Sequence, residues 1–484
     1  MSKIQNRVPY RLPKPLYCDP EEIGERPSME QVKEYIRLHE TRLRRYEYLE
    51  SLYEGFHDIF RQPDKADWKP DWRLAVNFPR YITDTFAGYG YGTPVKISHP
   101  DEAVSNAVEQ FERNNEFSDV TMELVRYCSM YGHAWSYLYQ DEQAQTNVTA
   151  LTPKEFFCVY DDTMKKRAVF AVRYGRHEVG DYKGELYGEI ITPKLVQFFD
   201  RGRIIPEREQ ANEYGRINAV EWQLNSIRMG LYEPVAGLIE LFNHTLSEKG
   251  NDVDAFAEAI LAVIGAEVDE KDIEDMRDKR LVNLFGTENV KDALVQYLTK
   301  PSADGTQENL LNRLERLIYQ IAMVANISDD SFGSAVSGVA LAYKLWSTSN
   351  VVQTFNRKIE KSLRKMFKLW CSFGTNCSRA DAYEDMDFQF SVNIPRNLQE
   401  ETDTAVKADG LISKRTQLSL LSYVPDPDAE MEQIEKERQE DEARHAQSLY
   451  GGDVQAAVAI LEAAGYTVSR KEVIEDGEED TAEE

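Results

Sequence analysis

The 484-residue chain carries 57 basic and 84 acidic side chains, which gives a net charge of −27, and 42% of its residues are hydrophobic. This length allows about two to four structural modules, and the apolar fraction is high enough to exclude a disordered protein. Strong acidity argues against tight nucleic-acid binding, which depends on neutralising phosphates, although the charge could equally serve only solubility.

The five cysteines are scattered and form no Cys-x-x-Cys pair. This pattern argues against a disulfide framework or a structural zinc site, and for a reducing compartment. The first residues have no apolar signal-peptide core. No apolar run approaches the roughly 18 residues that a membrane span needs, since the best candidate, Phe256–Val268, contains two glutamates. We therefore expect no membrane association, no metal site and no cofactor.

The first part of the chain predicts an arm followed by helices. Residues 1–28 are rich in proline and predict an extended arm. Apolar spacing predicts a helix over Met29–Phe60, another over Arg80–Gly88, and two helices within Ala103–Gly132. The stretch Gly88–Pro94 predicts a turn, because it lacks the lysine and the strand-to-helix context of a phosphate loop.

From Ala134 to Glu221 the hydrophobic period changes to two, which predicts β-strands. Turn residues separate the candidates, which are Trp135–Leu138, Asn147–Ala150, Phe156–Tyr160, Ala168–Arg176, Glu185–Thr192, Leu195–Phe199 and Val220–Leu224. We therefore expect a β-rich part after the first helices.

Two further helices flank a charged insertion. A helix begins after Pro234, which suits a first helical turn, and Gly250 is expected to end it. Residues 254–306 are short of apolar periodicity and rich in charge, and Asn309–Ala325 predicts a second helix. The pair suggests a stem that carries an excursion at its far end.

The most informative stretch is Asn326–Phe373. Glycine, serine and aspartate dominate Ile327–Gly338, which predicts a mobile loop, and Ser337 or Gly338 can cap a helix that starts near Val339. One apolar stripe runs along this helix, made of Val352, Phe355, Ile359, Leu363, Met366 and Trp370. A helix of about thirty residues is unusual, since globular helices average about eleven, although an ordinary surface helix with a connector remains possible.

The C-terminal part predicts short elements. Asp387–Ile394 alternates as a strand. Helices are expected over Glu400–Gly410, over Lys414–Leu421, from Val424 onward in an acidic run, and over Asp453–Gly465. The end of the chain, Glu472–Glu484, has acidic residues and no basic one, which predicts a solvated tail.

Four stretches, taken together and in order, carry a resemblance to a known family: Leu52–Ile59, Asn77–Val95, Leu238–Phe256 and Phe332–Trp346. They resemble portal proteins of tailed bacteriophages, siphophage type. The resemblance covers roughly residues 40–440, and no single stretch is diagnostic without the others.

The resemblance implies a mainly helical α+β fold, the portal fold with wing, stem, clip and crown regions. On this chain the implied regions are an N-terminal arm (1–28), a wing (29–225), a stem helix (226–253), a clip (254–306), a returning stem helix (307–326), a tunnel loop (327–338), a long helix with a wing strand (339–395), a crown (396–465) and an acidic disordered tail (466–484).

The implied function is that of a portal subunit rather than an enzyme. Twelve copies would form a ring around a DNA channel at one capsid vertex, for genome packaging, retention and ejection. Implied partners are double-stranded DNA bound without sequence specificity, the terminase large subunit, the major capsid and scaffolding proteins, and a head-completion adaptor. The protein would assemble in the host cytoplasm and reside in the virion. A channel whose walls are negatively charged would let DNA pass without binding it tightly.

The resemblance also implies two sets of contact residues. The tunnel loop would touch DNA through Ser328, Asp329, Asp330, Ser331, Phe332, Gly333, Ser334, Ser337 and Gly338. Serine, glycine and backbone groups can meet phosphates without reading sequence. The clip would meet terminase or an adaptor through Lys271, Arg277, Lys279 and Arg280, which a solvated face explains equally well.

No enzyme motif is found: the chain has no His-Glu-x-x-His, no Gly-x-Ser-x-Gly and no Walker lysine. The carboxylate pairs that could hold Mg²⁺ each lie at a predicted turn or cap, where aspartate is expected anyway, and they are Asp161-Asp162, Asp329-Asp330 and Asp426/Asp428. Two alternatives to the hypothesis of a portal protein stay open. One is a metal-dependent nuclease or other hydrolase acting on nucleic acid, and the other is a cytosolic adaptor built on the long helices.

Overall fold

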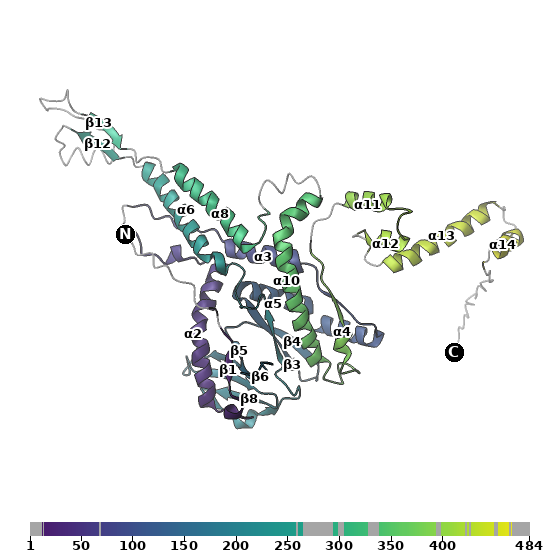
Figure 1. Ribbon diagram of the computed structural model, residues 1–484, viewed down its shortest axis with the longest axis horizontal. Helices are drawn as coiled ribbons and strands as arrows, with labels where there is room; N and C mark the ends of the chain where they lie inside the picture. The colour runs from purple at the N-terminus through teal and green to yellow at the C-terminus, as the bar shows by residue number, and fades with distance from the viewer. Residues whose placement is uncertain are drawn as a thin grey trace, which may run out of the picture. The chain divides into compact units, whose positions relative to one another are not determined.

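The computed structural model describes residues 12, 14–66, 69–257, 260–264, 294–298, 304–327, 338–393, 398–421, 424, 427–449, 454–463 and 466. The chain divides into two units, Met1–Ile394 and Pro395–Glu484, whose elements are labelled in Figure 1. Helices predominate and sheets accompany them. The expected class, α+β and mainly helical, is therefore confirmed.

The first unit contains both helices and strands. Its helices are α1 (Pro20–Ile23), α2 (Met29–Glu54), α3 (Phe78–Tyr91), α4 (Glu102–Asn114), α5 (Phe117–Tyr131), α6 (Ala236–Ala257), α8 (Asp304–Ala322) and α10 (Gly338–Trp370). Short 3₁₀ turns are η1 (Asp58–Arg61), η2 (Pro206–Arg208), η3 (Glu233–Val235) and η5 (Ala382–Glu384). Its strands are β1 (Leu16–Cys18), β2 (Lys96–Ser98), β3 (His133–Gln140), β4 (Thr146–Leu151), β5 (Phe156–Asp161), β6 (Ala168–Arg176), β7 (Leu186–Ile191), β8 (Leu195–Asp200), β9 (Arg203–Ile204), β10 (Gln210–Ala211), β11 (Ala219–Gln223), β12 (Ile260–Ile264), β13 (Leu294–Leu298) and β14 (Asp387–Gln389).

Helix α2 connects two cores. A capping box starts it, since the Gln31 backbone N–H donates to Ser28 Oγ (3.3 Å) and the Ser28 N–H donates to Gln31 Oε1 (2.9 Å). Gly55 ends it in the left-handed conformation, with φ of 91°. Near its start the helix packs Ile36 against the larger sheet, and near its end it packs Leu49 into the main core. One helix thus ties the sheet to the helical body.

The strands form two principal sheets. In the larger sheet the order is β1-β5-β6-β7-β8-β10, with β9 pairing to β8, and in the smaller sheet the order is β11-β3-β4. Trp135 and Phe156 belong to a core between the two sheets. All seven predicted strands are confirmed as β3 to β8 and β11. The N-terminal arm is not simply extended, because β1 joins the larger sheet parallel to β5 and α1 follows it.

Helices α6 and α8 contact one another side by side (Figure 1). A polar stripe on α6 holds the backbone of an extended segment that follows η1: the N–H groups of Trp72, Leu74 and Val76 donate to side-chain oxygens at 2.6, 2.9 and 2.8 Å. The acceptors, one per helical turn, are Asn251, Ser247 and Asn243. Alternate N–H groups of the segment are thereby satisfied without a partner strand.

Of two predictions that depended on glycine, one was wrong and the other was wrong in part. Gly250 does not end the helix predicted after Pro234, since α6 runs on to Ala257. The prediction for Gly88–Pro94 also fails in part, because α3 continues through Tyr91 before it ends. In both places tertiary packing outweighs the cost of glycine in a helix, about 1 kcal/mol. An added Cβ at Gly90 would lie 2.9 Å from Val352 Cγ2, so glycine there lets α3 approach α10 closely.

Other boundaries shift by a few residues. The returning helix α8 begins before the predicted Asn309 and ends before Ala325. The predicted strand over Asp387–Ile394 is shorter, since β14 spans Asp387–Gln389 and pairs with β2. In the insertion, β12 and β13 pair as antiparallel strands.

The second unit is helical where it is described. Its helices are α11 (Leu398–Lys407), α12 (Lys414–Ser419), α13 (Pro427–Leu449) and α14 (Val454–Ala463), which confirms the four predicted helical segments. Gln417 of α12 donates a hydrogen bond to the Ala405 carbonyl (2.7 Å), and Arg415 forms two bonds with Asp428 of α13 (2.6 and 2.7 Å). Apart from Tyr466, the predicted acidic tail 466–484 lies outside the described residues. Within the described parts of both units, no helix is long and apolar enough to cross a membrane.

Candidate functional site

Most of the predicted contact residues lie outside the described residues. This holds for the tunnel-loop positions from Ser328 to Ser337 and for the clip residues Lys271, Arg277, Lys279 and Arg280. Gly338, the last predicted loop residue, is the first residue of α10. The structure does describe how both ends of this segment are attached to the body of the first unit.

The chain enters the predicted tunnel loop from an anchored point. After α8, the Ala325 N–H donates to Thr348 Oγ1 of α10 (3.0 Å), and the Ile327 N–H donates to the Tyr81 hydroxyl of α3 (2.8 Å). Between them, Asn326 Nδ2 donates to Glu315 Oε1 of α8 (3.3 Å). Three helices therefore fix the residues immediately before the loop.

The helix at the other end of the loop is long and firmly packed. Helix α10 has 33 residues, and the six residues of its predicted apolar stripe are each at most 2% exposed. Phe355 contacts Phe86 and Tyr91 of α3, with ring centroids 6.1 and 5.6 Å apart. The predicted stripe is thus confirmed, and the packed part of α10 can act as a rigid support for its first turns.

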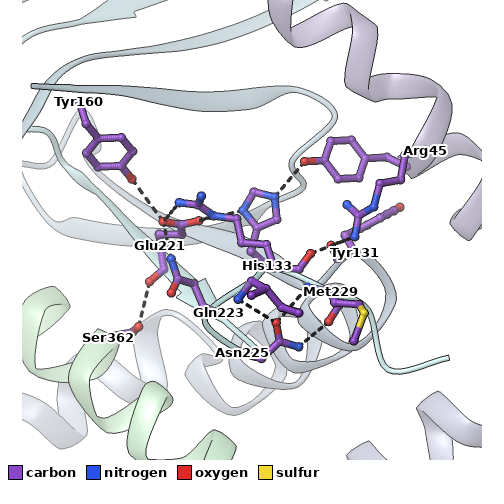
Figure 2. Close-up of polar contacts among 12 residues, drawn as sticks. Arg45, Tyr131, His133, Tyr160, Glu221, Gln223, Asn225, Met229 and Ser362 are labelled. Carbon is purple, nitrogen blue, oxygen red and sulfur yellow. Dashed lines mark hydrogen bonds and ion pairs between the residues drawn. The ribbon is translucent and has the colours of Figure 1, made fainter. Parts of the chain in front are cut away.

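A buried charge network joins α10 to the sheets and to α2 (Figure 2). At its centre Glu221 of β11, whose side chain is 10% exposed, accepts two hydrogen bonds from Arg228 (2.5 and 2.8 Å). His133 Nδ1 lies 2.9 Å from Glu221 Oε1, and the Tyr160 hydroxyl lies 3.3 Å from Oε2. A carboxylate with so many donors is held in its charged form.

The electrostatics of this network follow from burial and pairing. Burial alone would raise the pKa of Glu221, but Arg228 and the His133 hydrogen bond outweigh it and hold that pKa below its ordinary value. Burial lowers the pKa of His133, so its ring is neutral at pH 7. Because a carboxylate only accepts, His133 Nδ1 carries the proton and Nε2 accepts from the Tyr46 hydroxyl, 3.0 Å away.

The network extends to two more elements. Arg45 of α2 pairs with Glu233 (2.5 and 2.7 Å) and also donates to the carbonyl of Arg228 (2.9 Å). From α10, Ser362 Oγ donates to the backbone carbonyl of Glu221 (2.9 Å). These bonds connect α2, β11 and the long helix, so the arrangement positions α10 rather than exposing a reactive group.

Two of the aspartates suggested as Mg²⁺ ligands, Asp161 and Asp428, have local structural partners. Asp161 Oδ1 accepts from Thr163 Oγ1 and from the Arg167 N–H, both at 2.8 Å, which closes the turn after β5. Asp428 is paired with Arg415, while Asp329, Asp330 and Asp426 lie outside the described residues. Across the described parts of the chain, no group of three His, Cys, Asp or Glu could hold a metal ion.

The family described as "Phage portal protein, SPP1 Gp6-like" matches residues 32–444 of this chain. The chain belongs to this family of portal proteins. The portal protein of Bacillus phage SPP1 is 21% identical over 415 residues, which cover 80% of each chain. A chain in the neck of an empty GTA particle is 10% identical to this chain, with a TM-score of 0.40, and the match covers 71% of this chain and 89% of the other.

Family membership decides the general nature of the protein. A portal protein is a structural, non-enzymatic component of the phage virion, and the family implies an oligomeric ring in the phage head. The family match favours the hypothesis of a portal protein over the hypotheses of a nuclease and of a cytosolic adaptor.

We expect the stability of the portal protein to fall as the pH drops below 6.5, partly because of His39. Burial, and then Arg42, lower the pKa of His39 to about 3, whereas an unfolded histidine titrates near 6.5. Below pH 6.5 the unfolded chain therefore binds a proton that the folded chain refuses, at a cost of about 2 kcal/mol by pH 5.

His39→Phe keeps the ring stacked on Phe157, now 4.7 Å between centroids, and removes the titration. The free energy of unfolding, measured with urea at several values between pH 5 and pH 7.5, should depend less steeply on pH in this variant than in the wild type. An equal pH dependence in the two proteins would show that His39 takes up its proton in the folded state.

Sequence reasoning missed the buried network altogether. One signal was present, since Glu221 lies between Val220 and Trp222 in a short apolar strand, where a charge needs a partner. That partner, Arg228, is only seven residues away and carries the opposite charge. His133 and Tyr46 could not be assigned, because the pairing of β11 with β3 and the packing of α2 bring them to this place.

Proposed function

We propose that this portal protein forms a ring of twelve copies around a DNA channel at one capsid vertex. The genome would pass through this channel during packaging and ejection and be retained by it in between. Family membership supports the ring. The observation that carries the channel is that both flanks of residues 328–337 are held by the first unit, at Ile327 on one side and by helix α10 on the other.

In this proposal the Gly/Ser segment is the tunnel loop. Ser328–Gly338 would contact duplex DNA through hydroxyl and backbone groups, which hold phosphates without reading sequence. The strong negative charge of the chain, −27, would keep duplex from adhering elsewhere in the channel. The loop would thus guide DNA while the channel as a whole lets it slide.

The other regions keep their proposed roles. Helices α6 and α8 would form the stem, the insertion between them the clip, and the second unit the crown. The clip residues Lys271, Arg277, Lys279 and Arg280 would dock the terminase large subunit, whose ATPase drives translocation, and later a head-completion adaptor. Major capsid and scaffolding proteins would surround the ring during assembly in the host cytoplasm.

Electron microscopy of the purified full-length protein tests this proposal. At micromolar concentration we expect closed rings with a central opening, and in solution a mass that is a multiple of 55.7 kDa. A protein that stays monomeric at every concentration tested would contradict the proposed function.

A further inference from the structure

One face of α10 is exposed along most of the helix. Tyr343 and Trp346, near its start, are 76% and 64% exposed. About three helical turns later on the same side come Arg357, Lys361 and Lys365, all exposed and spaced four residues apart. We call these five residues the α10 ridge.

The cations of the α10 ridge form no ion pair in the part of the chain that the structure describes. Among the described residues, none of the three has an ion-pair partner, although other basic residues of α10 do have partners: Arg364 bonds Glu360 (3.3 Å) and Lys368 lies over the Tyr383 ring (4.8 Å). Partial burial, and then Lys361, lower the pKa of Lys365. In a chain of net charge −27, this group of cations, which are unpaired among the described residues, is a surface that an acidic partner could bind.

A complementary surface lies where α4 leads into α5. Four acidic side chains follow one another there at short intervals, and none of them has an ion-pair partner within the described ranges: Glu112, Glu116, Asp119 and Glu123. Burial, and then the neighbouring Glu109, raise the pKa of Glu112 to about 7. We call these four residues the α4–α5 acidic patch, and a nearby cation would stabilise its charged form.

No ion pair joins the two surfaces among the described residues of one subunit. On the buried side of α10, Phe367 contacts Phe111 of α4 and Phe117 of α5, with ring centroids 5.9 and 6.3 Å apart. The α10 ridge lies on an exposed side of the same helix, whereas the side that contacts α4 and α5 is buried. No described part of the first unit covers it.

A closed ring of identical subunits needs two different surfaces that fit one another, because each interface in it is heterologous. We propose that the α10 ridge of one subunit docks on the α4–α5 acidic patch of the next copy. This inference rests on the proposed ring and assigns its contact residues.

Protein is the better partner for this face than DNA. The α10 ridge combines tryptophan, tyrosine and arginine, the residue types that dominate the centres of protein interfaces. Phosphate binding needs only cations, so it leaves two largely exposed aromatic rings unexplained. Neighbouring copies of the chain supply both an acidic surface and the proximity that assembly requires.

Charge reversal tests the pairing directly. One variant reverses the ridge, Lys361→Glu with Lys365→Glu, and another reverses the patch, Asp119→Lys with Glu123→Lys. Each alone should raise the concentration at which rings form at least tenfold, measured by mass photometry and sedimentation. Mixed in equal amounts, the two variants should form rings again, because each reversed surface then meets its complement in an alternating ring.

A matched control reverses two exposed lysines near the larger sheet, Lys165→Glu with Lys183→Glu, and should assemble like the wild type. Circular dichroism and thermal unfolding must show that every variant is folded. The inference is overturned if the ridge-reversed protein forms rings at the wild-type concentration, or if the mixture fails to form them. It is equally overturned if ridge reversal weakens binding to a duplex oligonucleotide and leaves assembly unchanged. A wild-type protein that forms no ring would overturn the proposed function itself, and this inference with it.

Discussion

Glu221→Gln is expected to lower the free energy of unfolding of the first unit by about 3 kcal/mol or more. The substitution keeps the shape of the side chain but leaves the buried guanidinium of Arg228, 11% exposed, without its charge partner. Removing one member of a buried ion pair typically costs about 3–5 kcal/mol, because the other charge stays desolvated. The amide would also face His133 Nδ1–H with one acceptor fewer.

The measurement is urea unfolding at low protein concentration, followed by the fluorescence of buried tryptophans such as Trp222. The matched control is Glu25→Gln, which removes an exposed pair with Lys194 in the same unit and should cost less than about 1 kcal/mol. The pKa of Glu221 is lowered in the folded state, so its contribution is present above the unfolded value near 4.3 and lost as the pH falls. The difference between wild type and Glu221→Gln should therefore shrink in acid, and equal stabilities at pH 7 would contradict the role of the network.

Gly132→Ala is expected to destabilise the first unit by about 3 kcal/mol in total. Gly132 joins α5 to β3 with φ of 86°, where an L side chain is strained. An added Cβ would also lie 2.2 Å from the carbonyl of Arg228, a backbone atom that cannot turn aside. That carbonyl accepts a hydrogen bond from Arg45, so the clash reaches the buried network.

Gly180→Ala separates the two causes. Gly180 also has a positive φ, 81°, but an added Cβ there meets nothing within 4 Å. It should therefore cost only the backbone strain, about 1 kcal/mol. Thermal unfolding of both variants gives the comparison, and equal losses would show that the close approach of Arg228 does not matter.

Much of the helical framework could be predicted because its signals are local. The apolar stripe of α10, the two helices around Asn114 and the seven strands depend on the spacing of neighbouring residues, and all are confirmed. Gly90 and Gly250 misled the prediction, because the partners that hold them in helices are distant in sequence. The charge network was out of reach for the same reason. The tunnel-loop and clip residues stay predictions.

The central claim is that the segment before α10 faces a channel formed by many copies. An electron cryomicroscopy reconstruction of the assembled full-length protein tests it most directly. We expect a closed ring in which residues 328–338 of every copy point at the central opening. A ring that carries these residues on its outer rim, away from the symmetry axis, would contradict it.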